Sequence, residues 1–257
     1  MKYIKTCYDF PMNICVTGAS KGLGRELCKE LLKAGHSVWG VARSRAAEFC
    51  GSESPGELNR FHYTQCDVAD SVSIGRWMQE MQQAKFHPDV IILNAAIQHN
   101  DLGSTFDAAA AAETINVNLA GSLHCISAFL PQLQARKHGQ IIAITSTIKW
   151  RPSRRSAGYA ASKAGLSMAM RSLRLKYGTK ALRFREVCFG PLQTSMWEGK
   201  QSLLIPSPDK AAARVASFLT GNRDTLCYPF LSTWLLRLSH WLPDSLFTAI
   251  SNHLLLK

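Results

Sequence analysis

Near-continuous apolar runs of strand length, separated by segments of helix length, restrict the fold of this chain more than any other feature. Residues 89–97 read DVIILNAAI and residues 140–147 read QIIAITST. Strands without regular polar alternation are buried on both faces, as in parallel sheets that helices cover on both sides. The alternation of such strands with helices therefore predicts an α/β fold, a Rossmann-type doubly wound parallel sheet with helices on both faces.

Other segments are predicted to complete a sheet of about seven strands: 12–18, 36–42, 61–68, 183–190 and 225–230. Helices are predicted at 22–35, after Asp70, at 107–119 and at 121–136. The chain has no internal repeat and no low-complexity linker, so its 257 residues are expected to form one domain. Residues 191–208 are expected to form a substrate lid, and residues 231–257 a helical tail.

A glycine-rich turn, TGASKGLG, follows the first predicted strand at residues 17–24. Gly18, Gly22 and Gly24 suit a backbone that turns sharply and approaches a pyrophosphate closely. The N-terminus of the following helix presents free N–H groups and the positive end of its dipole to such an anion. Because the turn lies between a strand and a helix, it predicts a dinucleotide-binding site.

Tyr159 and Lys163 stand four positions apart in SAGYAASKAG, within a run of small residues that is typical of a helix. Residues at this spacing share one helix face. Taken alone, the pair is also explained by a tyrosine at the edge of the core and a solvated lysine. A cation beside a tyrosine, however, favours the phenolate and lowers the pKa of the phenol.

These motifs, in this order, resemble those of the short-chain dehydrogenase/reductase family, in its single-domain reductase branch with TGxxxGxG and YxxxK motifs. The resemblance covers residues 12–195 and includes Asp67 after the third strand, Asn94 in NAAI, and Asn118 in NVNLAG. Ser146 precedes Tyr159 at the spacing typical of the family.

The chain departs from the family pattern at two places. Ala95 and Ile97 replace an Asn and a Gly in the usual NNAG, and Phe189 replaces the usual Pro before Gly190. The second departure affects only the contacts expected from the loop beside the nicotinamide.

The resemblance implies a catalytic role for four residues. Tyr159 would act as general acid in carbonyl reduction and general base in alcohol oxidation, and Ser146 would orient the substrate. Lys163 would lower the pKa of Tyr159 and bind the nicotinamide ribose, and Asn118 would hold a water of a proton relay. The residues implied in cofactor binding are Gly18, Ser20, Lys21, Gly22, Leu23, Gly24, Arg43, Asp67, Val68, Asn94, Tyr159, Lys163, Gly190 and Thr194.

The end of the second predicted strand indicates which nicotinamide cofactor is used. Ala42 stands where NAD-preferring members carry an acidic residue, and Arg43 follows it. Arg43 can pair with a 2′-phosphate, and Lys21 can approach the same group from the glycine-rich turn. We therefore expect NADP(H) to be preferred over NAD(H); the alternative is that Arg43 belongs to a solvated loop.

The formal net charge of +12 is concentrated where acidic residues are absent, from Thr114 to Arg185. Nucleic acid, an anionic membrane surface and anionic small ligands are the three explanations. The chain has no nucleic-acid-binding motif, so no nucleic acid partner is expected. The loop between the catalytic Ser and Tyr would bind an anionic substrate, or form a solvated surface, through Lys149, Arg151, Arg154 and Arg155.

The lid and the tail each leave alternatives open. Met196 and Trp197 would either close over the ligand or pack in the core. The tail has apolar residues at helical spacing, which suits a helix facing the core, another subunit or a membrane surface. Eight cysteines without CxxC or zinc-like spacing predict no metal site, and reduced thiols in a cytoplasmic protein.

The sequence therefore predicts an NADP(H)-dependent oxidoreductase acting on a small-molecule carbonyl or alcohol, with an anionic substrate as one option. The family resemblance implies a homodimer or homotetramer. The alternative function is a non-catalytic nucleotide-sensing or scaffold protein of the same fold, and the intact Ser146, Tyr159 and Lys163 argue against it.

Overall fold

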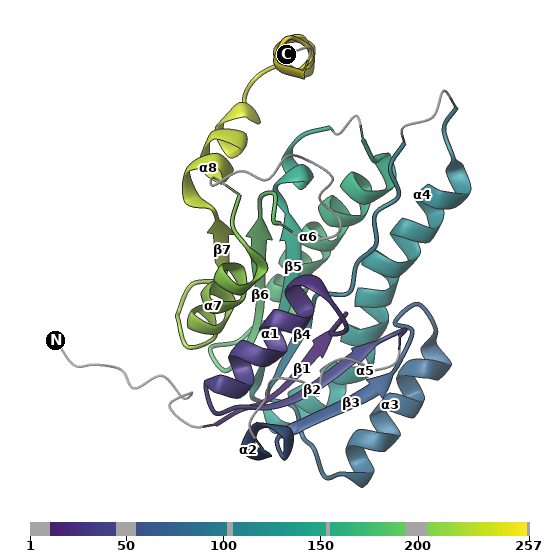
Figure 1. Cartoon of the computed structure of the whole chain (residues 1–257), viewed down its shortest axis with the longest axis vertical. Coiled ribbons are helices and arrows are strands. Elements are labelled where there is room, and N and C mark those ends of the chain that lie inside the picture. Colours follow the sequence, from purple (N-terminus) through teal and green to yellow (C-terminus); the bar gives the residue numbers. More distant parts are fainter. Residues whose placement is uncertain (1–10, 45–54, 102–104, 153–154, 194–204, 256–257) are drawn as a thin grey trace, which may run out of the picture.

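A single seven-stranded parallel sheet organises the chain (Figure 1). The computed structural model describes residues 11–44, 55–101, 105–152, 155–193 and 205–255. The strand order is β3-β2-β1-β4-β5-β6-β7, which confirms the predicted α/β doubly wound architecture. The strands are β1 (Asn13–Thr17), β2 (Ser37–Ala42), β3 (Phe61–Gln65), β4 (Val90–Leu93), β5 (Gly139–Ser146), β6 (Leu182–Phe189) and β7 (Thr225–Tyr228).

Two hydrophobic cores lie on opposite faces of this sheet. In β1, Ile14 and Val16 face one core and Cys15 faces the other. The first core is closed by α1 (Gly22–Lys33) and α7 (Pro208–Leu219). The second is closed by α3 (Ser71–Gln83), α5 (Gly121–Arg136) and α6 (Ala157–Tyr177). Burial on both faces explains why these strands are apolar without alternation.

The remaining helices are short or lie toward the ends of the chain: α2 (Pro55–Leu58), α4 (Ala108–Ile115), a 3-10 turn (Thr147–Trp150), α8 (Phe230–Ser239) and α9 (Asp244–Leu255). The last two extend beyond the carboxyl end of β7, at one end of the molecule (Figure 1). Within the described ranges, every helix is too short or too polar to cross a membrane.

Two helix ends follow the sequence closely. The Asp70 carboxylate accepts hydrogen bonds from the N–H groups of Val72 and Ser73 at 3.0 and 3.2 Å, which confirms the predicted start of α3. Gly35 has a φ of +91°, and its N–H donates to the Leu32 carbonyl at 3.0 Å just after α1 ends.

The segment from 107 to 136 differs from the prediction of two separate helices. A π-helical turn, η1 (Asn116–Ala120), joins α4 to α5 without a break. The strand predicted at 89–97 is also shorter, because β4 ends at Leu93. Beyond it, the Asn94 N–H donates to the Thr17 side chain at the end of β1 instead of to a backbone carbonyl of that strand.

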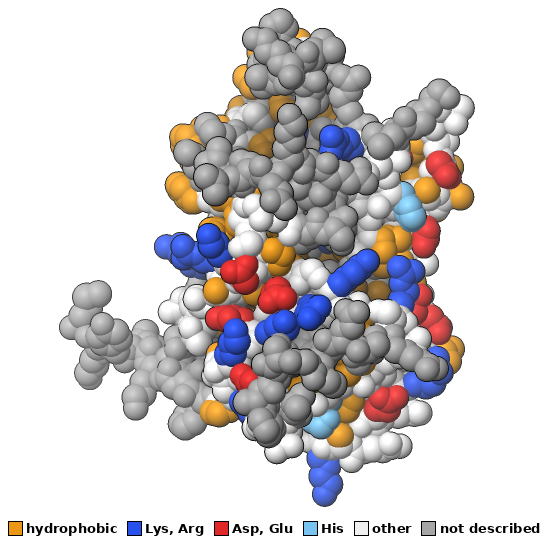
Figure 2. Space-filling model, in the orientation of Figure 1, with side chains coloured by type: hydrophobic (Ala, Val, Ile, Leu, Met, Phe, Trp, Pro, Cys, Tyr) orange, Lys and Arg blue, Asp and Glu red, His pale blue; other side chains and the backbone are white. Residues whose placement is uncertain are grey.

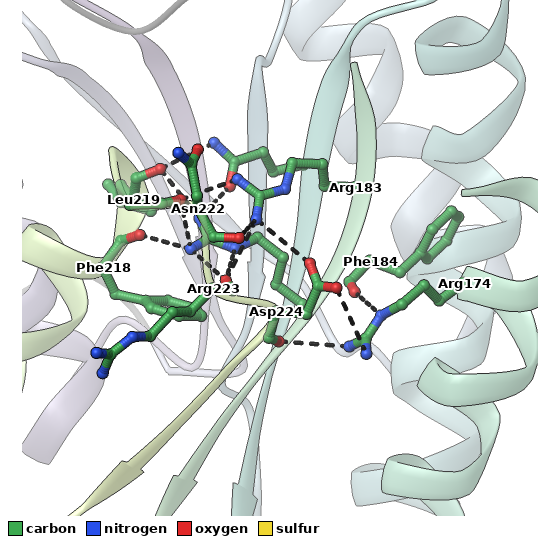
Figure 3. A network of polar contacts seen from close by, with 11 residues as sticks. Arg174, Arg183, Phe184, Phe218, Leu219, Asn222, Arg223 and Asp224 are labelled. Carbon is green, nitrogen blue, oxygen red and sulfur yellow. Dashed lines mark hydrogen bonds and ion pairs between the residues drawn. The ribbon is translucent and has the colours of Figure 1, made fainter. Parts of the chain in front are cut away.

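The β6–β7 edge of the sheet is tied to α7 by Arg185, which is fully buried. Its guanidinium lies 3.7 Å from the centre of the Phe218 ring and donates to the Gln140 amide oxygen at 2.6 Å. It also donates to the backbone carbonyls of Phe218, Leu219, Gly221 and Arg223. Arg174 and Arg183 contact Asp224 beside this cluster (Figure 3). Carbonyls at a helix C-terminus favour a cation, so these backbone groups stabilise the buried positive charge of Arg185.

Candidate active site

Ser146, Tyr159 and Lys163 come together where β5 ends and α6 begins. The Ser156 side chain caps α6 by accepting from the Tyr159 N–H at 3.2 Å. Lys163 is only 2% exposed, and its Nζ donates to the Ile144 carbonyl of β5 at 3.0 Å. The same Nζ lies 5.6 Å from the centre of the Tyr159 ring. The i, i+4 spacing therefore aims both side chains at the end of the strand that carries Ser146.

The pKa values of Tyr159 and Lys163 differ from the expectation. Burial raises the pKa of Tyr159 to about 12, a hydrogen bond with Ser146 lowers it in part, and Cys188 raises it further. Burial also lowers the pKa of Lys163 to about 8. The pKa of the phenol is thus raised, not lowered as expected from Lys163, because desolvation dominates. At neutral pH the tyrosine carries its proton and the lysine carries the positive charge.

Asn118 lies in the π-helical turn and is fully buried. Its Oδ1 accepts from the Ile97 N–H at 2.8 Å, and its Nδ2 donates to the Ile97 carbonyl at 2.9 Å. The Nδ2 also donates to the Ser162 hydroxyl at 3.1 Å, next to Lys163 in the chain. Asn118 therefore fixes the segment after β4 against α6, and its part in a proton relay stays a prediction.

The glycine-rich turn is as tight as its sequence indicates. Gly18 and Gly22 have φ values of +70° and +55°, which side-chain-bearing residues rarely adopt. A Cβ on Gly24 would lie 2.1 Å from the Gly18 carbonyl oxygen. Asn94 supports the turn, since its Nδ2 donates to the Thr17 carbonyl at 3.0 Å. Asn94, which is predicted to contact the cofactor, thus stabilises the backbone turn that would hold it.

The beginning of α1 leaves its first N–H groups without a side-chain cap from the described part of the chain. Side chains cap α3, α4 and α6, whereas α1, like α8, has no side-chain cap and no acidic residue in its first turn among the described residues. Its first N–H groups suit an anion. Ser20 and Lys21 border this turn with exposed surface. Leu23 and Val68 face the cores, so only their backbones are available to a ligand.

A hollow of about 570 Å³ lies at the carboxyl ends of β2 and β3. Its lining includes predicted residues and others: Arg43, Gln65, Asp67, Asp70, Ser73, Arg76 and Glu80. Arg43 is half-exposed and lies 3.9 Å from Glu113. Figure 2 shows Lys and Arg side chains mixed with Asp and Glu across the middle of the molecule. No motif in the sequence marks Arg76. It lines the hollow because it lies one turn into α3.

Arg151 has partners other than those expected of a substrate-binding residue. It is 6% exposed, and its guanidinium donates to Ser239 at 3.2 Å, the Leu242 carbonyl at 2.8 Å and Asp244 at 2.7 Å. It also lies 4.6 Å from the centre of the Phe247 ring. Arg151 therefore holds the C-terminal helices against the loop after β5.

Lys149, from the same basic loop, belongs to a buried ion pair that the sequence does not predict. Its Nζ lies 2.6 Å from Glu186 Oε1 and donates to Ser167 at 3.2 Å. The Thr145 hydroxyl donates to the same carboxylate at 2.5 Å. Burial alone would raise the pKa of Glu186, but the ammonium and these hydrogen bonds hold it below its ordinary value. Pairing across β5 and β6 could not be read from a single sequence.

Other predicted site residues are placed less fully. Arg154, Thr194, Met196 and Trp197, with the central part of the predicted lid, lie outside the described residues. Arg155 is exposed, and Gly190 donates its N–H to the Tyr228 carbonyl at 2.9 Å. In the described part of the chain, no three His, Cys, Asp or Glu side chains cluster as metal ligands would.

A second cavity, of about 330 Å³, lies between α6, the 3-10 turn and the C-terminal helices. Its lining is Ile148, Lys149, Trp150, Arg151, Pro152, Ala160, Ala161, Ala164, His240 and Asp244. Neither Ser146 nor Tyr159 contributes to it, so it is not the space in which a substrate would meet those groups.

Comparison with known proteins agrees with this geometry. The family model described as short chain dehydrogenase matches residues 12–203. The 3-oxoacyl-(acyl-carrier-protein) reductase FabG of Buchnera aphidicola is 26% identical over 193 residues, which are 73% of this chain and 76% of that protein. The human protein named short-chain dehydrogenase/reductase 3 is 24% identical over 252 residues, 91% of this chain and 80% of that protein.

A solved structure shares the fold. The short chain dehydrogenase from Burkholderia cenocepacia J2315, in complex with NADP, superposes with a TM-score of 0.78 at 24% identity. The match covers 93% of this chain and 96% of that chain. Identity at this level shows the fold alone, and the site must be judged on its own residues.

Proposed function

This chain belongs to the short-chain dehydrogenase/reductase family and is an NAD(P)-dependent oxidoreductase, and from that premise we propose that it transfers a hydride between NADP(H) and a carbonyl or secondary alcohol. The observation that carries the proposal is the cluster of Ser146, Tyr159 and Lys163 at the end of β5. A nucleotide sensor or scaffold would have no need of a phenol beside a buried ammonium group.

The three residues have separate tasks in carbonyl reduction. Ser146 donates a hydrogen bond to the substrate oxygen and orients it. Tyr159, whose pKa of about 12 keeps it protonated, gives its proton to that oxygen as negative charge develops there. Lys163 stabilises the phenolate that results, because its ammonium lies 5.6 Å from the ring centre. In alcohol oxidation the proton returns to Tyr159.

The residues present fit a dinucleotide. The crowded Gly18–Gly24 contact leaves bare backbone at the start of α1, where uncapped N–H groups would hold the pyrophosphate. Arg43 and Asp67 line the hollow that would take the adenosine end. Asn94 keeps the turn in shape, and Lys163 would also contact the nicotinamide ribose. When bound, the cofactor supplies or accepts the hydride, and the oxidised ring adds positive charge.

The decisive test is a screen for turnover, in which nicotinamide absorbance is the readout. Aldehydes, ketones and secondary alcohols are offered with NADPH, NADP, NADH and NAD, in matched pairs with and without a carboxylate. Turnover that Ser146→Ala removes supports the proposal, and faster turnover of the carboxylate members supports an anionic substrate bound in part by Arg155. Tight cofactor binding without turnover of any pair would favour the sensor.

Arg43 is proposed to set the preference for NADP(H). Arg43→Ala is expected to raise the Kd for NADPH about fivefold to tenfold, because a charge-assisted hydrogen bond at a half-exposed site contributes about 1 kcal/mol. The Kd for NADH should stay within about twofold, since NADH lacks the 2′-phosphate. Titration of nicotinamide fluorescence measures both. Arg171→Ala, which removes an exposed arginine from α6, is the control and should change neither. Equal weakening of both cofactors would contradict this role.

The C-terminal helices and the turn between them present large apolar side chains that do not pack on the core: Phe230, Trp234, Leu238, Trp241, Leu242 and Leu246. Trp241 is 85% exposed and Phe230 is 73% exposed. Hydrophobic side chains are visible over α8 in Figure 2. Two tryptophans in an amphipathic stretch of a chain with net charge +12 suit the interface of an anionic bilayer. We propose this row as a surface that contacts such a membrane.

The double variant Trp234→Ser with Trp241→Ser tests the membrane contact. Binding to vesicles of phosphatidylcholine and phosphatidylserine, measured by co-sedimentation, should fall about 100-fold to 1000-fold, because each buried tryptophan contributes about 2 kcal/mol. Phe106→Ser removes an exposed aromatic side chain outside the tail and should leave binding unchanged. A different outcome would make the row a subunit contact. In that case the wild type does not bind vesicles but self-associates in ultracentrifugation, and the double variant no longer self-associates.

A homodimer or homotetramer remains a proposal for the assembly. Leu123 of α5 and Met168 and Leu175 of α6 are exposed on outward helix faces, which supports it. A cytoplasmic location likewise stays a prediction from the sequence.

A further inference from the structure

Two cysteines face each other across the last pair of strands. Cys188 of β6 and Cys227 of β7 are register partners in a parallel ladder. Paired residues of neighbouring strands project to the same face, with Cα atoms about 4.8 Å apart. Disulfides need Cα separations of about 4.4 to 6.8 Å. The strand pairing alone therefore brings these two thiols within bonding reach.

The two thiols differ in access and are in contact. Cys188 is fully buried, whereas Cys227 keeps exposed surface. A hydrogen bond from the Cys188 thiol lowers the pKa of Cys227. Lys149 and Arg237 act in the same direction, while burial and Glu186 oppose them. Cys227 is thus the thiol that a small oxidant reaches first, with a second thiol ready behind it.

We propose that Cys227 and Cys188 form a reversible oxidation site, in which hydrogen peroxide converts the pair to a disulfide that slows turnover. The Cys227 thiolate attacks one peroxide oxygen, the O–O bond breaks, and hydroxide leaves, so that sulfur is oxidised to the sulfenic acid. The sulfur of Cys188 then attacks the sulfenic sulfur. The S–S bond forms, the S–O bond breaks, and the hydroxyl leaves as water with the thiol proton. Two thiols and one peroxide give one disulfide and two waters.

The position of the pair connects it to the site. Cys188 is close enough to Tyr159 to raise the pKa of the phenol, and Phe189 and Gly190 follow it at the end of β6. A disulfide most often holds its two Cα atoms about 5.5 to 6 Å apart, so bridging this pair spreads the ends of β6 and β7. That shift moves the strand end beside the phenol, so the disulfide is expected to lower kcat.

The test uses the full chain and does not depend on the proposed reaction. Reduced protein is treated with hydrogen peroxide, alkylated and mapped by mass spectrometry without reduction. We expect a linked peptide pair containing Cys188 and Cys227, lighter by two hydrogens, which dithiothreitol separates. Peroxide that leaves both cysteines available to alkylation would overturn the inference, even if the protein proves to be an active reductase.

Variants separate the two steps and the effect on turnover. Cys188→Ala should trap the sulfenic acid at Cys227, detected as a dimedone adduct. Cys227→Ser should keep its turnover under peroxide doses that lower the turnover of wild type about fivefold or more. Cys125→Ala, at a buried cysteine of α5, should respond like wild type. Inhibition that persists in Cys227→Ser, or full cross-linking without inhibition, would contradict the control of turnover by this pair.

Discussion

Tyr159→Phe is expected to lower kcat/KM about 10²- to 10⁴-fold, the range that a positioned general acid or base contributes. The ring fills the same space, so the loss is that of one hydroxyl proton beside the substrate oxygen. Unfolding free energy should change by only about 1 kcal/mol, because a single hydrogen bond with Ser146 is lost. Steady-state kinetics with the best substrate from the screen, and denaturant unfolding, measure the two quantities.

Tyr177→Phe is the matched control, since Tyr177 closes the same helix far from Ser146. It should retain full activity. The Kd for NADPH should also stay within about twofold in Tyr159→Phe, because the ring itself is kept. Undiminished turnover in Tyr159→Phe would remove the basis of the proposed mechanism, and the nucleotide-sensing alternative would then stand.

Lys163→Met is expected to abolish most activity and at the same time to stabilise the protein. Lys163 is 2% exposed, and burial lowers its pKa from 10.5 to about 8. That shift corresponds to a cost of about 3 kcal/mol near neutral pH, at about 1.4 kcal/mol for each pKa unit. Removing the ammonium also leaves the Ile144 carbonyl without this donor, which costs about 1–2 kcal/mol. We therefore expect a net gain of about 1–2 kcal/mol, with kcat lowered about 100-fold or more.

The sign of the pH dependence identifies this ammonium as the cause. A lysine whose pKa is lower in the folded state is protonated in the unfolded chain and neutral in the folded one between about pH 8 and 10.5. The unfolded state then binds more protons, so the wild type gains stability as pH rises through this window. The advantage of Lys163→Met should shrink by about 1 kcal/mol between about pH 7 and 9. An advantage independent of pH would refute the assignment.

Lys149→Met provides the opposite case. Lys149 is also buried, but its ammonium lies 2.6 Å from Glu186 Oε1. Its removal leaves a buried carboxylate without its cation, which is expected to destabilise the protein by about 3–5 kcal/mol. Two buried lysines on neighbouring elements should therefore give effects of opposite sign in the same unfolding experiment.

The architecture could be predicted from the sequence because its signals are local. Continuous apolar strands such as 140–147, the cap at Asp70 and the glycines of the first turn each report on their immediate surroundings. The sequence predicts two helices, at 107–119 and 121–136, because no residue type marks a widened turn in an otherwise helical stretch.

The candidate site could be predicted only in part, for a related reason. The positions of Tyr159 and Lys163 follow from their spacing on one helix, and both face the end of β5. The roles of Arg151 and Lys149 depend on partners far along the chain, at Asp244 and Glu186. A basic loop looks the same in a sequence whether its charges await a ligand or are paired inside the protein.

The π-helical turn at Asn116–Ala120 limits how the chain can change in length. Such a turn holds one residue more than a regular helix needs. Deleting any one of its residues would restore regular geometry and close the widened turn. Asn118 would then lose the position from which it bonds both backbone groups of Ile97. Insertions and deletions that accumulate in descendants of this protein are therefore expected to occur in its surface loops. They are expected to be absent from this short segment.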